Sequence, residues 1–284
     1  MPDVAKDVRM RTRTIEQHLS GRQHNHRFIR RIFSPEDLGE RLRPFVFLDY
    51  IHGQIPDGGG FGFHPHSGIA TVTFQQSIDI DYEDTTGQKG VVRARGIEYV
   101  QAGECLWHRA SLRSNSEDST GFQLWLSLPP ELEEAPARAE YLPPEAVPQK
   151  DNVRVLLGEY QGARSPIVGP YPINYFWVSL EAGQTFSFVP PAGHEVAWAF
   201  AFGGVVDCSG LSTSEELLIF DREDGALLFV AKTPAQLMVA SSPPHPHPLA
   251  IGWSSVHTSP EVLQRCEAKM ADMGKELRRS GRIL

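Results

Sequence analysis

The sequence predicts an all-β protein of two domains that ends in one α-helix. Turn residues interrupt the chain often, since 25 glycines and 22 prolines occur among its 284 residues. Between the turns, apolar and polar residues alternate over short runs, which is the pattern of half-buried strands. Residues from about 260 to 279 instead repeat apolar side chains at helical spacing. The length suits one large domain or two domains of ordinary size.

The first half contains the clearest strand patterns. We expect strands over residues 27–32, 45–50, 64–75, 78–83, 91–93, 97–101, 104–108 and 122–128. The last of these stops at Pro129-Pro130, because proline cannot donate to a strand ladder. Residues 129–149 are rich in Pro, Glu and Ala and predict a connector between domains 1–135 and 136–284.

The second half continues with short strands and then changes to a helix. The expected strands cover 153–158, 175–180, 185–189, 196–202, 217–220, 226–231 and 236–240. Turn signals at roughly 8–12 residue spacing are typical of a β-sandwich or barrel. Thr258-Ser259-Pro260-Glu261 marks a helix start, with a hydroxyl cap before a proline. The apolar stripe that follows predicts packing against a barrel: Val262, Leu263, Cys266, Met270, Met273 and Leu277.

Charge and cysteine content exclude several classes of function. The formal net charge of −8 argues against a surface that binds nucleic acid directly. Cys105, Cys208 and Cys266 are odd in number and far apart, so no disulfide framework or zinc ribbon is expected. The polar start of the sequence predicts no secretory leader, and the lack of a long apolar run predicts no membrane span. These features predict a cytoplasmic protein with no membrane partner.

The most informative motif is His64-Pro65-His66, with His108 as a third candidate on a later strand. Two residues that lie two apart on a strand point to the same face. Imidazole is a common ligand for first-row transition metals. The even positions from 64 to 74 end in large apolar side chains, so we expect this face, with both histidines, to look into a core. The three histidines therefore form a candidate metal site.

Several segments around these histidines resemble the pirin family of bicupins. They are Phe47-Leu48-Asp49, Gly62-Phe63-His64-Pro65-His66-Ser67-Gly68, Thr86-Gly87-Gln88-Lys89-Gly90, Gln101-Ala102-Gly103 followed by His108, and Phe122 to Pro129. The similarity is densest over residues 44–130. It implies two jelly-roll (cupin) barrels packed face to face, with a metal held only in the first by His64, His66 and His108. Iron is the metal that the resemblance favours, with zinc, manganese, nickel and copper as alternatives.

The sequence departs from the family where a carboxylate ligand is expected. The fourth ligand of pirins is a glutamate two residues after the last histidine, and this position is Ala110. Other cupins often have a glutamate four residues after the second histidine, and this position is Ala70. Neither alanine can bind a metal.

Three interpretations of the site remain open at this level. Three imidazoles alone support a divalent metal in known zinc sites, with open positions for other ligands. Alternatively, Glu104, which has the same parity as His108, or Glu98 on the preceding strand supplies the acid. In the third interpretation, the histidines remain in a barrel that no longer binds metal tightly. Glu104 is thus the weak candidate for a catalytic residue.

The other histidines receive lower priority as ligands. His245-Pro246-His247 repeats the motif, but it lies in a proline-rich exit from a strand and predicts a surface loop. His24 and His26 are candidates for a barrel mouth, and His52 is a candidate for the lining of the first pocket. His194 begins a strand of the second barrel, but position 196 is Val, so this barrel is expected to be metal-free. Cys105 is expected to be a packing residue.

Two functions follow from the resemblance. The first is a metal-dependent dioxygenase acting on flavonols of the quercetin type, with a small aromatic ligand in the pocket. Because Ala110 replaces the family's glutamate, this activity is expected to be weak unless Glu104 or a water takes its place. The second is a non-catalytic, metal-modulated regulatory protein that binds transcription or metabolic proteins.

Overall fold

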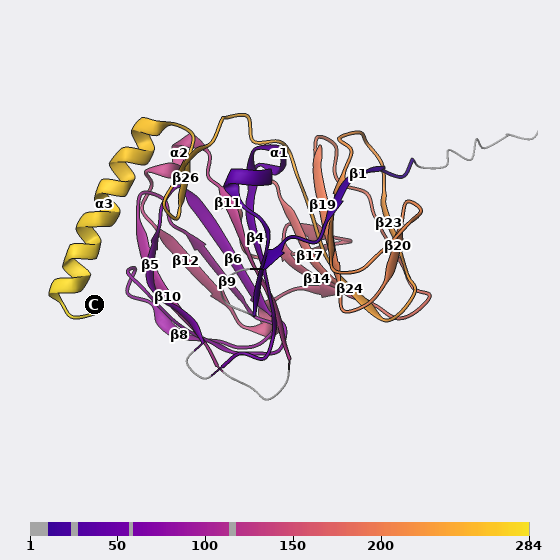
Figure 1. Ribbon diagram of the computed structural model, residues 1–284, viewed down its shortest axis with the longest axis horizontal. Helices are drawn as coiled ribbons and strands as arrows, with labels where there is room; N and C mark the ends of the chain where they lie inside the picture. The colour runs from indigo at the N-terminus through magenta and orange to yellow at the C-terminus, as the bar shows by residue number, and fades with distance from the viewer. Residues whose placement is uncertain (1–10, 24–27, 57–58, 114–117, 284) are drawn as a thin grey trace, which may run out of the picture.

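The computed structural model describes residues 11–23, 28–56, 59–113 and 118–283 of the chain. Two β-sheet halves lie side by side, and a C-terminal helix covers the outer end of the first half (Figure 1). Each half combines a seven-stranded sheet with a four-stranded sheet. The predicted all-β fold with a terminal helix is confirmed.

The first half is built from antiparallel strands. Its seven-stranded sheet has the order β12 (Arg138–Leu142), β9 (Ile97–Gln101), β6 (Ile69–Gln75), β11 (Ser119–Ser127), β4 (Phe45–Gly53), β3 (Ile29–Phe33) and β2 (Arg22–Gln23). Its four-stranded sheet has the order β5 (Gly60–His66), β10 (Leu106–Leu112), β7 (Ile80–Asp84) and β8 (Lys89–Val92). A π-helical turn (Pro35–Gly39), α1 (Glu40–Leu42) and α2 (Pro130–Glu133) connect these strands.

The second half repeats this architecture. Its seven-stranded sheet has the order β1 (Ile15–Leu19), β22 (Glu216–Phe220), β19 (Val196–Phe202), β24 (Ala235–Ser242), β17 (Asn174–Leu180), β14 (Val153–Leu157) and β13 (Gln149–Lys150). Its four-stranded sheet has the order β18 (Thr185–Phe188), β23 (Leu227–Ala231), β20 (Val206–Cys208) and β21 (Leu211–Thr213). Smaller elements are the pair β15 (Glu159–Tyr160) and β16 (Ala163–Arg164), and a 3-10 turn at Pro144–Ala146.

The two seven-stranded sheets pack face to face through one large apolar core. Trp198 of the second half stands edge-on to Phe33 and Phe45 of the first, with ring centroids 5.8 and 5.6 Å away. Phe74 and Trp177 meet in the same layer, 4.9 Å apart. Strands that are buried on both faces have nearly continuous apolar sequences, as in Val196–Phe202.

One expectation about strand parity was wrong, because residues 64–75 form two strands. The chain bends at Gly68, where φ is +67° and a side chain would collide with the Val256 carbonyl, 2.1 Å from the Cβ position. After this bend, the even residues of β6, such as Ala70, face the core between the halves. The odd residues, such as Thr71 and Thr73, therefore face the interior of the first half, where the histidines lie.

The chain crosses between the halves in ways that a boundary at residue 135 did not predict. β1 pairs with β22 of the second half, although it precedes the whole first half. β12 lies after the boundary and pairs with β9 of the first half. Such exchanges cover sheet edges that would otherwise be exposed.

The C-terminal segment returns to the first half. It forms a small hairpin, β25 (Ala250–Gly252) and β26 (Ser255–His257), and then α3 (Pro260–Arg279). Ser259 caps α3 by accepting a hydrogen bond from the Val262 amide, as the sequence indicated. Met270 and Leu277 of α3 pack on Trp107 of β10. No helix in the described part of the chain is long and apolar enough to cross a membrane.

Candidate metal centre

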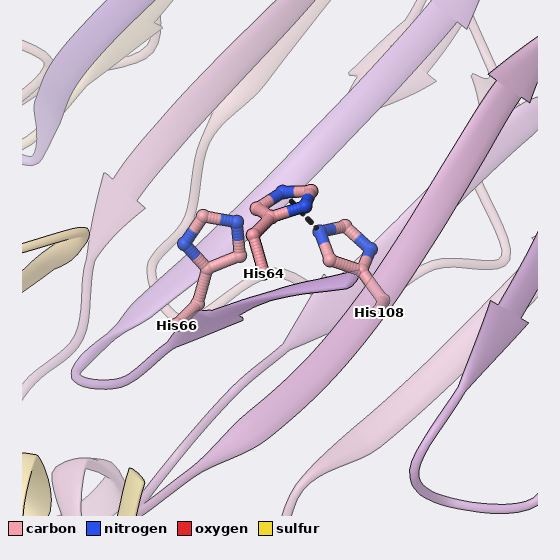
Figure 2. A group of neighbouring side chains, drawn as sticks. All are labelled: His64, His66 and His108. Carbon is pink, nitrogen blue, oxygen red and sulfur yellow. Dashed lines mark hydrogen bonds between the residues drawn. The ribbon is translucent and has the colours of Figure 1, made fainter. Parts of the chain in front are cut away.

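His64, His66 and His108 converge inside the first half (Figure 2). β5 and β10 are antiparallel neighbours, and their register places His64 directly opposite His108. His66 lies two residues further along β5 and therefore points to the same side. One nitrogen from each ring lies within 4.8 Å of the other two.

The outer nitrogen of each imidazole has an acceptor nearby. His64 Nδ1 lies 2.7 Å from the Gly62 carbonyl oxygen. His66 Nδ1 lies 3.0 Å from the Ser254 carbonyl oxygen. His108 Nδ1 lies 3.4 Å from Glu98 Oε1, at ion-pair distance. A hydrogen on each Nδ1 leaves the Nε2 lone pair free, which is how ligating histidines are usually held.

The inner nitrogens lack satisfactory partners within the protein. His66 Nε2 is buried without a hydrogen bond among the described residues. His64 Nε2 and His108 Nε2 lie 3.1 Å apart, so two lone pairs face each other when both nitrogens are unprotonated. A cation bound by all three Nε2 atoms would satisfy the orphaned nitrogen and remove this repulsion. The residues present therefore fit a divalent transition metal.

Burial favours the neutral form of His64 and His66. Desolvation, and secondarily the neighbouring His108, lowers the pKa of His64 to about 3. Desolvation, followed by the effect of His64 and His108, lowers the pKa of His66 well below its usual value. Protons therefore compete with a metal for these two histidines only in acid.

A pocket of about 420 Å³ opens beside His64 and His66. One of its walls is a stack of aromatic and cationic groups. The Trp125 ring lies 4.9 Å from His66 and stacks on Phe47 at 4.1 Å. Arg31 lies 3.9 Å above the other side of Phe47 and is held by Asp49 through a 2.5 Å ion pair. The buried Trp125 Nε1 has no acceptor among the described residues.

The β25–β26 hairpin forms a second wall of this pocket. Its tip carries Trp253, whose surface is 68% exposed, and Ser254, whose carbonyl holds His66. Glu267 of α3 accepts a hydrogen bond of 3.0 Å from the Trp253 amide. The C-terminal segment thus both borders the pocket and orients one of the three histidines.

Buried polar contacts fasten the end of the hairpin to the first half. His257 Nε2 lies 3.0 Å from Ser67 Oγ, next to His66 in the chain. Glu133 of α2 accepts hydrogen bonds from the Thr258 amide at 2.5 Å and from the Thr258 hydroxyl at 3.0 Å. These side chains lie in the interior, with Glu133 and His257 each 1% exposed.

The positions that could have carried a carboxylate ligand do not supply one. Ala110 follows His108 on the inner face of β10 and packs in an apolar cluster with Ile78 and Ile80. Ala70 faces the other barrel, so a longer side chain there would not reach the histidines. The sequence-based prediction that Glu104 supplies an acid to the site was wrong. Its side chain points outward and pairs with Lys269 of α3.

The remaining candidates lie away from the three histidines. His194 bonds Ser241 Oγ at 2.9 Å inside the second half. His245 was expected on a surface loop but is 1% exposed, because Tyr171 covers it and bonds its Nδ1. His52 stacks on Tyr50, outside the lining of this pocket. His24 and His26 lie outside the described residues.

Cys105 is a packing residue, as expected. It lies with Trp107 and Met270 in the apolar cluster beneath α3. Burial raises the pKa of its thiol to about 12, so the reactive thiolate is scarce at neutral pH.

Several pocket residues were not recognised from the sequence. Trp125 was visible only as one member of an alternating strand, and the strand pattern does not show which face borders a site. Trp253 and Ser254 gave no signal, because the link between residues 250–257 and β5 exists only in the folded chain. Arg31 was missed for the same reason, since its role depends on Phe47 and Asp49 across the sheet.

Comparisons with known proteins agree with this fold. Residues 22–126 match the family model described as Pirin. A Pseudomonas aeruginosa protein, named provisionally as a quercetin 2,3-dioxygenase, is 27% identical over 235 residues, which cover 78% of this chain and 82% of that protein. The crystal structure of quercetin 2,3-dioxygenase from Acinetobacter baumannii has a TM-score of 0.83 at 21% identity, covering 93% of this chain and 98% of that one. The bacterial pirin YhhW from Escherichia coli, in complex with nickel(II), has a TM-score of 0.62 at 19% identity, covering 78% and 95%.

The paired β halves, with three histidines inside the first, define a bicupin with one candidate metal centre. Residues 22–126 of the chain match the pirin family model. This region departs from the pirin pattern, because Ala110 stands at the position of the family's glutamate ligand.

Proposed function

We propose that this protein is a metal-dependent dioxygenase that acts on flavonols of the quercetin type. The observation that carries the proposal is the convergence of three imidazoles, all with Nδ1 near an acceptor, beside an aromatic-lined pocket. The names of the relatives from P. aeruginosa and A. baumannii support the choice of substrate.

His64, His66 and His108 would hold the metal through Nε2. A bound divalent metal supplies Lewis acidity, which polarises coordinated oxygens and favours the ionised form of a hydroxyl. Iron is our first choice by family resemblance, and the nickel bound to YhhW makes nickel the first alternative to test.

The pocket residues would position a flat substrate. The Trp125–Phe47 stack offers an aromatic wall, and Trp253 offers a second ring at the mouth. Planar aromatic ligands gain from such offset or edge contacts. Because imidazole is an uncharged ligand and no carboxylate belongs to the three-residue ligand group in the described chain, the charge of a dication would favour an anionic oxygen ligand. The substrate proton would then leave to water at the open side of the pocket.

A regulatory role without catalysis remains the second candidate from the sequence. No observation in the described residues favours it over the enzyme, since the conspicuous features of the site all face a small pocket. We therefore rank the small aromatic ligand above a protein partner.

We also propose a cytoplasmic location. The three cysteines are all unpaired and buried in the described structure. Free thiols persist in a reducing compartment, whereas secreted proteins commonly pair them.

The test is oxygen consumption with quercetin after loading with iron, nickel, manganese, copper or zinc. We expect turnover with at least one metal, and loss of both metal and turnover in His64→Ala. The matched control is His247→Ala, which removes a histidine from the second His-Pro-His segment, away from the site. Absence of turnover with every metal in a protein that binds metal would exclude the activity. Unchanged metal content in His64→Ala would show that the site lies elsewhere.

A further inference from the structure

Glu98 is a buried carboxylate that the proposed reaction does not use. It lies on β9, has no exposed surface, and points into the first half across from Thr73. Its Oε1 is 3.4 Å from His108 Nδ1, the ring nitrogen that faces away from the other histidines. Neither carboxylate oxygen nor His108 Nδ1 has a hydrogen bond among the described residues.

Two other buried carboxylates in the described chain, by contrast, accept hydrogen bonds. Asp84, 1% exposed, accepts hydrogen bonds from the amides of Thr86 and Gln88 and from the Tyr141 hydroxyl. Glu133 is similarly satisfied by Thr258. A buried carboxylate without such partners is costly unless a positive charge lies near it. No lysine or arginine forms an ion pair with Glu98 in the described chain, and its one ion-pair neighbour is His108.

A metal ion bound by the three histidines would explain why a carboxylate is buried at Glu98. A dication held by three neutral imidazoles would bring an uncompensated charge of +2 into the interior. The acceptors of His64 and His66 are backbone carbonyls, which are neutral. Only His108 has a charged acceptor among the described residues, and a carboxylate behind a ligating histidine fixes its tautomer and raises its basicity.

We propose that Glu98 is a positioning residue of the metal centre. It orients His108 through Nδ1 and supplies, one layer behind the ligand, the negative charge that Ala110 cannot supply directly. This inference rests on the three-histidine metal site of the proposed function, but it is independent of oxygen chemistry and of the substrate.

The test compares Glu98→Gln, Glu98→Asp and the control Glu104→Gln, which removes one charge from a surface ion pair. Affinity for zinc and cobalt(II) is measured by competition with a chromophoric chelator. We expect Glu98→Gln to bind roughly 10- to 100-fold more weakly than wild type, the usual effect of losing such a partner. Glu98→Asp keeps the charge and should recover part of the loss, whereas Glu104→Gln should match wild type.

Two further readouts separate positioning from a purely structural role. The visible absorption bands of bound cobalt(II) should shift in Glu98→Gln, because the His108 ligand changes in basicity. Without metal, Glu98→Gln should melt no lower than wild type, because it replaces a buried carboxyl group that accepts no hydrogen bond among the described residues. Its metal-induced rise in melting temperature should be smaller.

Three results would overturn the inference: wild-type metal affinity in Glu98→Gln, equal losses in the Gln and Asp variants, or unfolding of metal-free Glu98→Gln. A wild-type protein that binds metal but consumes no oxygen with quercetin would instead reject the proposed reaction. Glu98 would then still be judged by the affinities alone.

Discussion

The hydrogen bonds between Glu133 of α2 and Thr258 of the C-terminal segment predict that Glu133 affects metal binding at a distance. Glu133 holds Thr258 through two hydrogen bonds of 2.5 and 3.0 Å. Thr258 directly follows β26, and the same hairpin carries the Ser254 carbonyl that lies 3.0 Å from His66 Nδ1. Replacing Glu133 by Ala should therefore loosen the hairpin and release His66.

The magnitude follows from the contacts that are lost. Hydrogen bonds to a charged group contribute about 1.5–3 kcal/mol each, so two of them amount to about 3–6 kcal/mol. The Thr258 amide also loses its acceptor, while His257, 3.8 Å from Glu133, loses a neighbouring charge. A ligating histidine without its oriented acceptor typically costs roughly 10- to 100-fold in metal affinity.

Two measurements on Glu133→Ala check this reasoning. Urea unfolding gives the loss of stability, and limited proteolysis with a metal titration shows whether the tail opens and the affinity falls together. The control is Glu134→Ala, its neighbour, which pairs with Arg265 on the surface and should leave both measurements near wild type. If the tail of Glu133→Ala becomes sensitive to protease while metal affinity is unchanged, the hairpin does not orient His66.

Three further predictions concern the pocket. Because burial lowers the pKa of His64 to about 3 and that of His66 well below its usual value, the unfolded chain binds more protons below pH about 6.5. The free energy of unfolding of the metal-free protein should thus be level above that pH and fall on acidification towards pH 3. The fall should be about 1.4 kcal/mol per pH unit for each such histidine. A slope no steeper than that of His66→Ala would contradict this. Trp253→Ala should raise the KM for quercetin roughly 2- to 10-fold, as expected for one aromatic contact of about 0.5–1.5 kcal/mol, with metal content unchanged; an unaltered KM would remove Trp253 from the binding surface. Ala110→Glu places a carboxyl among apolar neighbours, so it should lower the free energy of unfolding of the metal-free protein by about 1–3 kcal/mol. Adding zinc should restore this loss. A zinc-induced gain no larger than in wild type would mean that position 110 does not face the metal.

The strands and the terminal helix were largely predictable from local patterns. Residues 196–202 and 97–101 were expected as strands and form β19 and β9 with those bounds. The start of α3 at Pro260 followed from its capping sequence. Such features depend on neighbours in the chain, which the sequence displays directly.

The faces of those strands were harder to predict. The parity argument assumed one strand from 64 to 75, whereas the bend at Gly68 moves β6 into another sheet. Since the side-chain period of a strand is two, a single bend can reverse which residues look into a pocket. Ala70 was considered because of the cupin resemblance, but it lies after this bend and faces the core between the halves. Glu104 was considered because of its parity with His108, but the strand of His108 begins only at Leu106.

By itself, the sequence determined the all-β class, the terminal helix and the three histidines, because alternation, capping and the His-x-His spacing act over a few residues. The tertiary structure alone decided what surrounds those histidines. It brings the Ser254 carbonyl to His66 from far along the chain, places Glu98 behind His108 from the other sheet of the first half, and turns Glu104 to the surface. These relations depend on strand register and on packing between distant segments, which no local pattern records.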